Sequence, residues 1–524
     1  RRLRRCYDRG PSKEALDVRL TAASLLTLVL ASPLPAAAAA PPEIRALWVD
    51  AFGAGMRTPE EAEELVLDAK RANLNVLFVQ VRRRGDALYT RGFEPPLDVP
   101  AYDPRFDALG HVIRVAHREG LKVHAWVNAM PVWRNEPPPC DARHLLNRHG
   151  PDAPGEEMWL TTSPEGKTLF PVGTFLDPGH PAVQEYLPRV YANLVVEYDL
   201  DGIHFDYIRY PETEGTLARG SAVGYNPAAL ARFGKATGRR DAPAPADEEW
   251  MAWRRLQVSH VVRRVYLETK ALKPRLVVSA SVIPWGAPPS GEEDFIGTAP
   301  MQRVFQDWHG WLREGILDLA VPMNYARETD PRVRGWFDGW VEWESRHAHG
   351  RAIAVGLGGY RNAPDDTLAQ LARVRGRGRL AGISLFSYRV PAAGPDGAES
   401  AAAAFPGERL LFLSSGTSDS PAPFPTPAPV PGFPWVESPR HGMLAGVVRS
   451  LHREDVDDVE VEVRRTGLFR RTHHPRTDAN GFFGLAQLPP GRYRVRLARR
   501  REGAVVVTIE PGRVARADLS AHAR

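Results

Sequence analysis

The chain has 524 residues, of which 43% are hydrophobic and 25% are charged. These values are typical of a folded protein with more than one domain, and they exclude a mainly disordered, collagen-like or polytopic membrane protein. The formal net charge is +5, but residues 1–40 carry +4, residues 440–524 carry +7 and the long part between them carries −6. Because the largest part is acidic, the charge gives no support to nucleic-acid binding. The two cysteines, Cys6 and Cys140, exclude a disulfide scaffold and a cysteine-based zinc site.

The first 40 residues have the pattern of a leader. Arg19 precedes the apolar run 20–30, LTAASLLTLVL, and an A-x-A sequence ends near Ala40. The run is too short to cross a bilayer, so the pattern predicts a secretory signal peptide within a 1–40 leader. We expect a bacterial protein that is secreted, periplasmic or in the cell envelope, with no stable membrane span once the signal is removed.

Eight apolar runs rich in β-branched and aromatic residues alternate with helix-forming segments between residues 41 and 412. Thr58, Pro59 and Glu60 are typical of a helix start, since they supply a cap, an N1 proline and an early acid. The alternation predicts a (β/α)8 TIM-type barrel, with a doubly wound sheet as the alternative, although no glycine-rich fingerprint follows the first strand. We expect the insertions 131–180 and 211–248 to lie on the catalytic face. The predicted strands are 45–52, 76–82, 122–130, 202–210, 275–285, 318–325, 352–360 and 380–388.

The C-terminal part of the chain changes character. Residues 413–440 are rich in serine and proline and predict an extended linker. Residues 441–524 contain short alternating strands separated by the turn sequences TDANG and LPPG, which predict a small all-β sandwich.

The segment 201–211, DGIHFDYIRYP, concentrates the residues that carry chemistry. His204 and Asp206 share one face of the fourth strand because side chains alternate. Asp206 then lies at the carboxyl end of its strand, where barrel active sites form. Tyr207 and Trp126 would surround it and tune it as a proton donor or nucleophile. The alternative is that Asp206 only caps or pairs with Arg209.

Other strands end with amide, hydroxyl, aromatic and charged side chains, which together suit a sugar ligand. The tryptophans 336, 340 and 343 have helical spacing and predict a core-facing stripe. Asp50 stands at the end of the first strand and is the second predicted catalytic carboxylate. The predicted substrate-binding residues are Gln80, Arg82, His124, Trp126, Asn128, His204, Tyr207, Asn324 and Tyr325.

A catalytic metal site is the alternative to a sugar-binding site here. His124, His204 and Asp206 could ligate a metal together, but the first strand, WVDAF, lacks the H-x-H pair of metal-dependent barrel hydrolases. No P-loop, H-E-x-x-H or G-x-S-x-G sequence is present. We therefore expect neither a catalytic metal nor a cofactor.

At these motifs the chain resembles the glycosyl hydrolase-like family 10 proteins, bacterial envelope barrels that include hydrolases of denuded peptidoglycan. The resemblance covers residues 43 to about 390 and is carried by RALWVDAF, VQVRRRGDALY, GLKVHAWVNAM, DGIHFDYIRYP and GLGGY. It implies a barrel, secretion and glycan cleavage, with Asp206 as the leading catalytic carboxylate. Many relatives have a second Asp directly after it, where this chain has Tyr207. Residues 441–524 resemble carboxypeptidase-regulatory-like sandwiches, which implies an accessory or wall-contacting module.

Glycoside hydrolysis generally needs two carboxylates. The sequence supplies no evident partner for Asp206, and Asp50 is the preferred candidate, with substrate-assisted catalysis as an alternative. Further candidates are Asp86, Glu94, Glu292, Asp307 and Glu328.

We therefore predict a glycoside hydrolase that acts on an amino-sugar polymer, foremost peptidoglycan glycan strands. The basic C-terminal sandwich would contact the cell wall. The alternatives are a non-catalytic glycan-binding envelope protein and a hydrolase of another exopolysaccharide.

Overall fold

The computed structural model describes residues 40–521 except for short gaps. The predicted signal peptide lies outside the described residues. Among the helices that are described, none is both long and apolar enough to cross a bilayer. Residues 40–524 form one compact unit. The gaps are 54, 100–101, 135–136, 214–218, 395–405, 453–454, 468–470, 499 and 501.

The predicted barrel is confirmed: eight parallel strands close into a ring in the order β1-β10-β9-β8-β7-β6-β3-β2. Each strand coincides with one of the eight predicted apolar runs, because strands buried on both faces read as continuous apolar sequence. The strands are β1 (Ile44–Val49), β2 (Val76–Arg82), β3 (Lys122–Asn128), β6 (Gly202–Asp206), β7 (Val277–Val282), β8 (Leu319–Pro322), β9 (Ala352–Gly358) and β10 (Gly382–Phe386).

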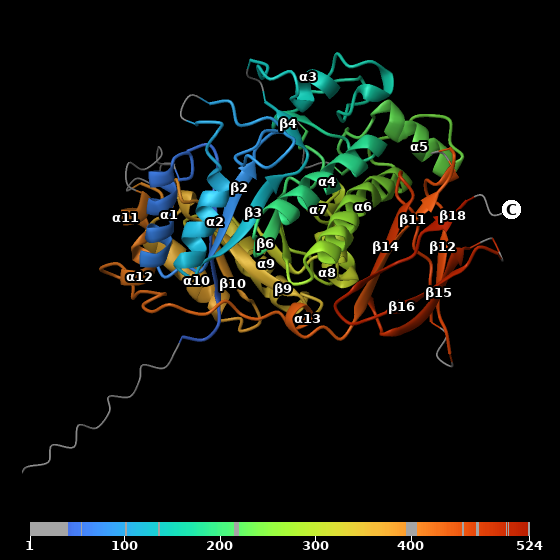
Figure 1. Ribbon diagram of the computed structural model, residues 1–524. Coiled ribbons are helices and arrows are strands. Elements are labelled where there is room, and N and C mark those ends of the chain that lie inside the picture. The colour runs from blue at the N-terminus through green and yellow to red at the C-terminus, as the bar shows by residue number, and fades with distance from the viewer. Residues whose placement is uncertain are drawn as a thin grey trace, which may run out of the picture. The chain divides into compact units, whose positions relative to one another are not determined.

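Helices surround this ring (Figure 1). The first begins as predicted: Thr58 is the N-cap and accepts a hydrogen bond from the Glu61 backbone N–H, and Pro59 is the first helical residue. Its apolar face, which includes Leu65 and Val66, is buried against the strands. The covering helices are α1 (Pro59–Arg71), α2 (Ala108–Arg118), α4 (Pro181–Glu197), α6 (Glu248–Leu272), α7 (Ala299–Gln302), α8 (Trp308–Glu314), α9 (Pro331–Arg346), α10 (Pro364–Arg375), α11 (Pro406–Leu410) and α12 (Phe412–Ser415).

The two predicted insertions follow the carboxyl ends of β3 and β6. The first contains the hairpin of β4 (Pro131–Trp133) and β5 (Thr174–Phe175), together with α3 (Leu145–His149) and η1 (Gly155–Glu157). The second contains α5 (Pro227–Thr237). In Figure 1 the first insertion lies above the strand ends, which places it over the mouth of the barrel.

The predicted linker is packed against the barrel rather than free. Residues 416–440, which we call the floor segment, run along the amino ends of the strands. Phe424 is fully buried beneath the guanidinium groups of Arg45 and Arg375. Arg45 also donates to the Thr426 carbonyl at 2.6 Å. In α13 (Pro434–Glu437), Trp435 Nε1 donates to Asp318 at 2.9 Å, just before β8.

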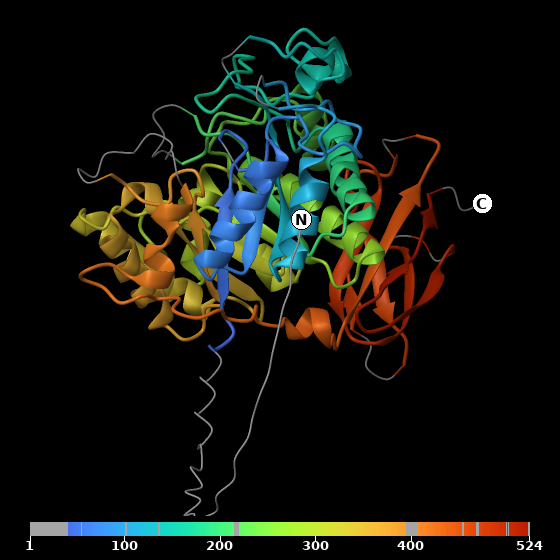
Figure 2. The same ribbon diagram turned by 60° about the vertical axis from the view of Figure 1, so that its left-hand side comes forward.

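The C-terminal module is built from two four-stranded sheets, as predicted (Figure 2). One sheet contacts the long barrel helix α6, and ion pairs join Arg232 to Asp457 at 2.7 Å and Arg264 to Asp478 at 3.5 Å. The module is therefore docked on the barrel. Its strands are β11 (Gly442–Arg449), β12 (Val461–Arg465), β13 (Thr472–His473), β14 (Phe482–Leu488), β15 (Gly491–Leu497), β16 (Val505–Ile509), β17 (Val514–Arg516) and β18 (Leu519–Ser520).

Candidate active site

A cavity of about 580 Å³ opens at the carboxyl ends of the barrel strands. This is the end at which parallel barrels place their active sites. Eight of the eleven predicted site residues line it: Asp50, Gln80, Trp126, Asn128, Asp206, Tyr207, Asn324 and Tyr325.

Asp206 ends β6 and is 6% exposed. Its Oδ2 accepts a hydrogen bond from Trp126 Nε1 at 3.1 Å, and its Oδ1 accepts one from the Tyr207 backbone N–H at 2.7 Å. Tyr207 has a left-handed φ of 48°, and this turn directs its N–H back toward the carboxylate. Burial raises the pKa of Asp206 from 3.8 to about 6, against the hydrogen bonds and Arg209, which lower it. A carboxyl group with this pKa can hold and deliver a proton near neutral pH.

A hydrogen-bond network joins Asp206 to the end of β1. Trp126 Nε1 is shared with Asn128 Oδ1 at 3.0 Å, and Asn128 Oδ1 also accepts from Gln80 Nε2 at 3.1 Å. Gln80 Oε1 then accepts from the Ala51 backbone N–H at 2.9 Å. The amides of Gln80 and Asn128 therefore connect side chains at the bottom of the cavity across four strands, β6, β3, β2 and β1.

Two further carboxylates line the cavity. Asp50 is 4% exposed and accepts hydrogen bonds from the Phe52 backbone N–H at 3.0 Å and Ser387 Oγ at 3.1 Å, beside Arg389 at 3.3 Å. Glu212 lies 3.3 Å from Arg209, and its side chain is 33% exposed. Sequence reasoning missed Glu212, although it directly follows the motif 201–211 and stands six residues after Asp206.

The other candidates for a second carboxylate do not line the cavity. Asp86 pairs with Arg83, Glu94 pairs with Arg82, and Glu328 pairs with Arg373. Asp307 is the N-cap of α8, and Glu292 lies beside two histidines. Of the candidates considered from sequence, Asp50 alone shares the cavity with Asp206.

His124 and His204 lie below the cavity. In the register of β3 and β6, Asn128 is level with Asp206, while Trp126 is level with His204. A strand rises about 3.3 Å per residue, so His204 is about 7 Å deeper than Asp206. His204 Nε2 accepts from Trp48 Nε1 at 3.0 Å, and Ser279 Oγ bridges both imidazoles. Burial lowers the pKa of both histidines, so they are neutral supports of the barrel core.

Arg82 also lies outside the cavity, for a different reason. The pairing of β2 and β3 is irregular between Gln80 and Arg82, so Arg82 pairs with Val127 and no longer shares the face of Gln80. Its guanidinium is fully buried, with Nε 2.9 Å from both oxygens of Glu94, and Nη1 bonds the Asn128 carbonyl. Arg82 therefore braces the end of β3.

Asn324 reaches the cavity from the end of β8 and is held by Glu344. Asn324 Nδ2 lies 3.1 and 3.0 Å from the two carboxyl oxygens of Glu344, which is completely buried in α9. Burial raises the pKa of Glu344 well above its ordinary value, and the two hydrogen-bond contacts fix the Asn324 amide.

Aromatic side chains from several loops complete the cavity. The predicted core-facing stripe is confirmed for Trp340 and Trp343, which are buried. It is wrong for Trp336, which is half-buried and lines the cavity together with Trp340. Sequence reasoning also missed the loop residues that line the cavity, because no periodicity connects loops that follow different strands. The aromatic lining residues are Trp48, Phe52, Trp126, Tyr207, Trp285, Tyr325, Trp336, Phe337, Trp340, Tyr360 and Phe386.

The raised pKa of Asp206 predicts a pH-dependent cost to stability. The folded state holds the proton more tightly than the unfolded state, so this contribution to stability is full below pH 4 and is lost as the pH rises through 6. A rise in pKa from 3.8 to about 6 corresponds to about 3 kcal/mol. We expect Asp206→Asn to raise the free energy of unfolding at pH 8 by about 1–2 kcal/mol, because it removes the buried charge. The gain is smaller than the full amount because asparagine accepts one fewer hydrogen bond.

Urea unfolding of the wild type and this variant at pH 4 and pH 8 measures the effect. The gain should vanish at pH 4, where the wild-type carboxyl group is protonated. An equal difference at both pH values would contradict the raised pKa.

Comparison with known proteins finds glycosyl hydrolases of similar sequence. The chain is 24% identical over 352 residues to glycosyl hydrolase YngK of Bacillus subtilis, covering 63% of each chain. It is 26% identical over 287 residues to glycosyl hydrolase DigH of Escherichia coli K12, covering 51% of this chain and 60% of DigH. The chain thus spans less than two thirds of the length of either relative.

Among solved structures, the glycoside hydrolase domain of PgaB (BpsB) from Bordetella bronchiseptica aligns with a TM-score of 0.47 at 17% identity, covering 68% of this chain and 97% of that domain. The model of the glycosyl hydrolase-like 10 family matches residues 43–362, which include every strand of the barrel except β10. The chain therefore belongs to the glycosyl hydrolase-like 10 family.

Proposed function

We propose that the protein is a glycoside hydrolase in which Asp206 is the proton donor. The observation that carries this proposal is the buried Asp206 carboxyl group, with a pKa of about 6, at the end of a barrel strand in a cavity rich in aromatic side chains. Aromatic rings stack on the apolar faces of sugars, and polar side chains then bond the hydroxyl groups.

In the proposed reaction, protonated Asp206 gives its proton to the oxygen of the glycosidic bond as the carbon–oxygen bond breaks. A second group stabilises the positive charge that develops on the sugar ring. Water supplies the new hydroxyl group, and its other proton restores the acid form of Asp206. The network through Trp126, Asn128 and Gln80 fixes the position of the carboxyl group before substrate binds.

Asp50 is the second carboxylate in this proposal. It is 4% exposed, and the network from Asp206 ends at the residue that follows it. We expect Asp50→Asn to lower kcat by about 100-fold or more, because the developing charge loses its counter-charge. Glu212→Gln is the matched variant. It should lower kcat by less than about tenfold, since the Glu212 carboxylate is more exposed.

Initial rates of the two variants at saturating substrate separate these roles. A larger loss in Glu212→Gln would move the second role to Glu212. Nearly wild-type rates in both variants would favour substrate-assisted catalysis.

The charge of the cavity supports an acidic glycan. Among the residues that the structure describes, six arginines and three carboxylates line it: Arg83, Arg84, Arg134, Arg209, Arg361 and Arg389, and Asp50, Asp206 and Glu212. Peptidoglycan strands without peptides carry a carboxylate on each muramic acid, and guanidinium groups bind carboxylates well. A deacetylated, cationic polysaccharide fits this lining less well. The proposed substrate is therefore the denuded peptidoglycan glycan strand.

The test is release of reducing ends by residues 41–524 from three polymers: denuded peptidoglycan, peptidoglycan with its peptides, and partly deacetylated poly-N-acetylglucosamine. We expect release from the first polymer and little from the others, and release by Asp206→Asn at least about 100-fold slower than by the wild type. Release from the third alone would refute the proposed substrate. Binding without release from any polymer would favour a non-catalytic glycan-binding protein.

The envelope location and the wall contact are part of the same proposal. The apolar run at residues 20–30 and the net charge of +7 on residues 440–524 support them. Removal of residues 1–40 during export, detected by N-terminal sequencing of the mature protein, tests the first. Salt-sensitive sedimentation of the full chain with cell walls tests the second.

A further inference from the structure

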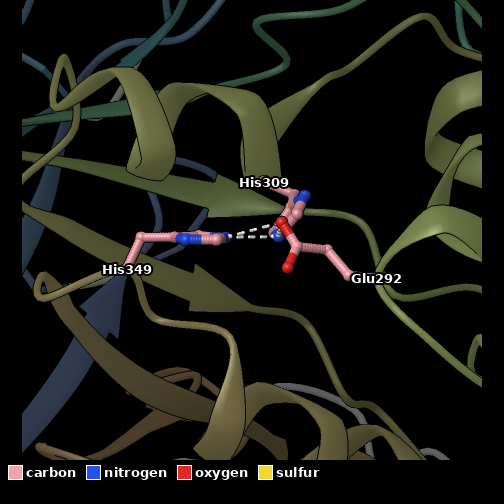
Figure 3. A group of neighbouring side chains, drawn as sticks. All are labelled: Glu292, His309 and His349. Carbon is pink, nitrogen blue, oxygen red and sulfur yellow. Dashed lines mark hydrogen bonds and ion pairs between the residues drawn. The ribbon is translucent and has the colours of Figure 1, made fainter.

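A second cluster of chemically active side chains lies away from the cavity. Glu292, His309 and His349 come from three separate segments: the loop before η2 (Glu293–Gly297), the helix α8, and the turn between α9 and β9. Figure 3 shows the three side chains converging on one point. Among the described residues, no other group of three or more His, Cys, Asp or Glu side chains has the spacing of metal ligands.

The distances within this cluster suit a small cation. The Nε2 atoms of His309 and His349 are 2.5 Å apart, so these two nitrogens share one hydrogen. Glu292 Oε1 lies 3.6 Å from His309 Nε2 and 3.7 Å from His349 Nε2. In tetrahedral zinc sites with bonds of about 2.0–2.1 Å, ligand atoms are about 3.4 Å apart. A metal would therefore replace the shared hydrogen with movements of less than about 1 Å.

The surroundings hold one ligand firmly and leave the others adaptable. The imidazole of His309 is 4% exposed and packs against Phe295 and Trp343 at ring distances of 5.0 and 5.2 Å. The side chains of His349 and Glu292 are 20% and 43% exposed. The site therefore has a fixed inner ligand and a solvent edge, where a water molecule can be the fourth ligand.

The Arg313 guanidinium competes with a metal ion for Glu292. Arg313 Nη1 lies 3.7 Å from Glu292 Oε1, but its side chain is 63% exposed and can turn into solvent. His347 lies outside the group whose ligand atoms are within 4.8 Å of one another. Its Nδ1 bonds the Trp343 carbonyl at 2.7 Å, and its ring stacks on Trp343. These two residues provide matched controls beside the site.

We infer that Glu292, His309 and His349 form a binding site for a divalent transition metal of the zinc type, with a structural role. Two imidazoles and a carboxylate are a common ligand set for zinc. Bound metal would tie the loop after β7 to α8 and to the turn before β9. Pro284, Trp285 and Gly286 of this loop line the cavity. The site is thus separate from the proposed chemistry and stabilises one side of the cavity.

The test uses residues 41–524 treated with a chelator and titrated with Zn²⁺ alone by calorimetry, and with Co²⁺ by visible absorption. We expect one ion per chain and the intense absorption of tetrahedral Co²⁺. Loss of an outer partner of a metal ligand weakens binding about 10–100-fold, so His349→Gln and His309→Gln should weaken it at least about 100-fold. His347→Gln should bind as the wild type does, and Arg313→Gln should bind more tightly.

Two results would overturn the inference. One is the absence of a stoichiometric site in the wild type. The other is equal Zn²⁺ affinity in the wild type and His349→Gln, with far-ultraviolet circular dichroism showing that both are folded. His474→Gln serves as the surface control, because His474 lies 2.7 Å from Glu460 in the C-terminal module and represents adventitious binding there.

Discussion

Replacement of Asp206 by asparagine is expected to lower kcat for glycan hydrolysis by about 10²–10⁴-fold, because the variant cannot deliver a proton to the leaving oxygen. The wild-type kcat/KM should fall as the pH rises above about 6, since the proton donor is then ionised. Initial rates between pH 4 and pH 9 on soluble glycan strands measure both effects.

The control is Asp201→Asn, which changes a carboxylate at the opposite end of the same strand, where it pairs with Lys122 and His117. Its activity should stay within about threefold of the wild type, because it is remote from the cavity. A rate that rises through pH 6 would make Asp206 a base or nucleophile. A fully active Asp206→Asn variant would remove Asp206 from the mechanism.

The largest loss of stability is expected from Glu94→Ala. This change leaves the Arg82 guanidinium fully buried without its counter-charge, which costs about 3–5 kcal/mol. The Tyr186 hydroxyl, which donates to Glu94 Oε1 at 2.7 Å, also loses its acceptor. The free energy of unfolding in urea at pH 7 measures the loss.

The double variant Arg82→Met with Glu94→Leu separates charge from packing. It should recover most of the stability, because neither charge remains buried. It should not recover activity, because the Asn128 carbonyl loses its brace from Arg82 at the end of β3. A loss below about 1 kcal/mol in Glu94→Ala would show that solvent reaches Arg82 and that the pair is not a buried one.

The barrel could be predicted from sequence because its strands are buried on both faces, and each one stands out as an apolar run between capped helices. The position of Asp206 followed from strand alternation and from the rule that barrels place chemistry at strand ends. Alternation also assigned His204 correctly to the inner face. Alternation could not predict how far below the cavity His204 lies, because this depends on the register between β6 and β3, which places His204 beside Trp126.

Other features depended on contacts between residues distant in sequence. The irregular pairing that turns Arg82 away from the face of Gln80 leaves no local signal, since both residues stand in an ordinary alternating run. Glu212, Trp285 and Trp336 reach the cavity from loops and a helix that follow three different strands. The sequence of the floor segment showed only its lack of regular structure, and composition does not reveal which surface such a segment covers.

The floor segment couples the unfolding of the barrel to that of the C-terminal module. It buries Phe424 at the amino ends of the barrel strands and places Trp435 on Asp318 before it enters the first strand of the C-terminal module. A chain cut at residue 412 would therefore expose apolar surface of the barrel. Heating should therefore melt the barrel and the sandwich in one cooperative transition. Neither end of the proline-rich segment is a boundary between parts that fold independently.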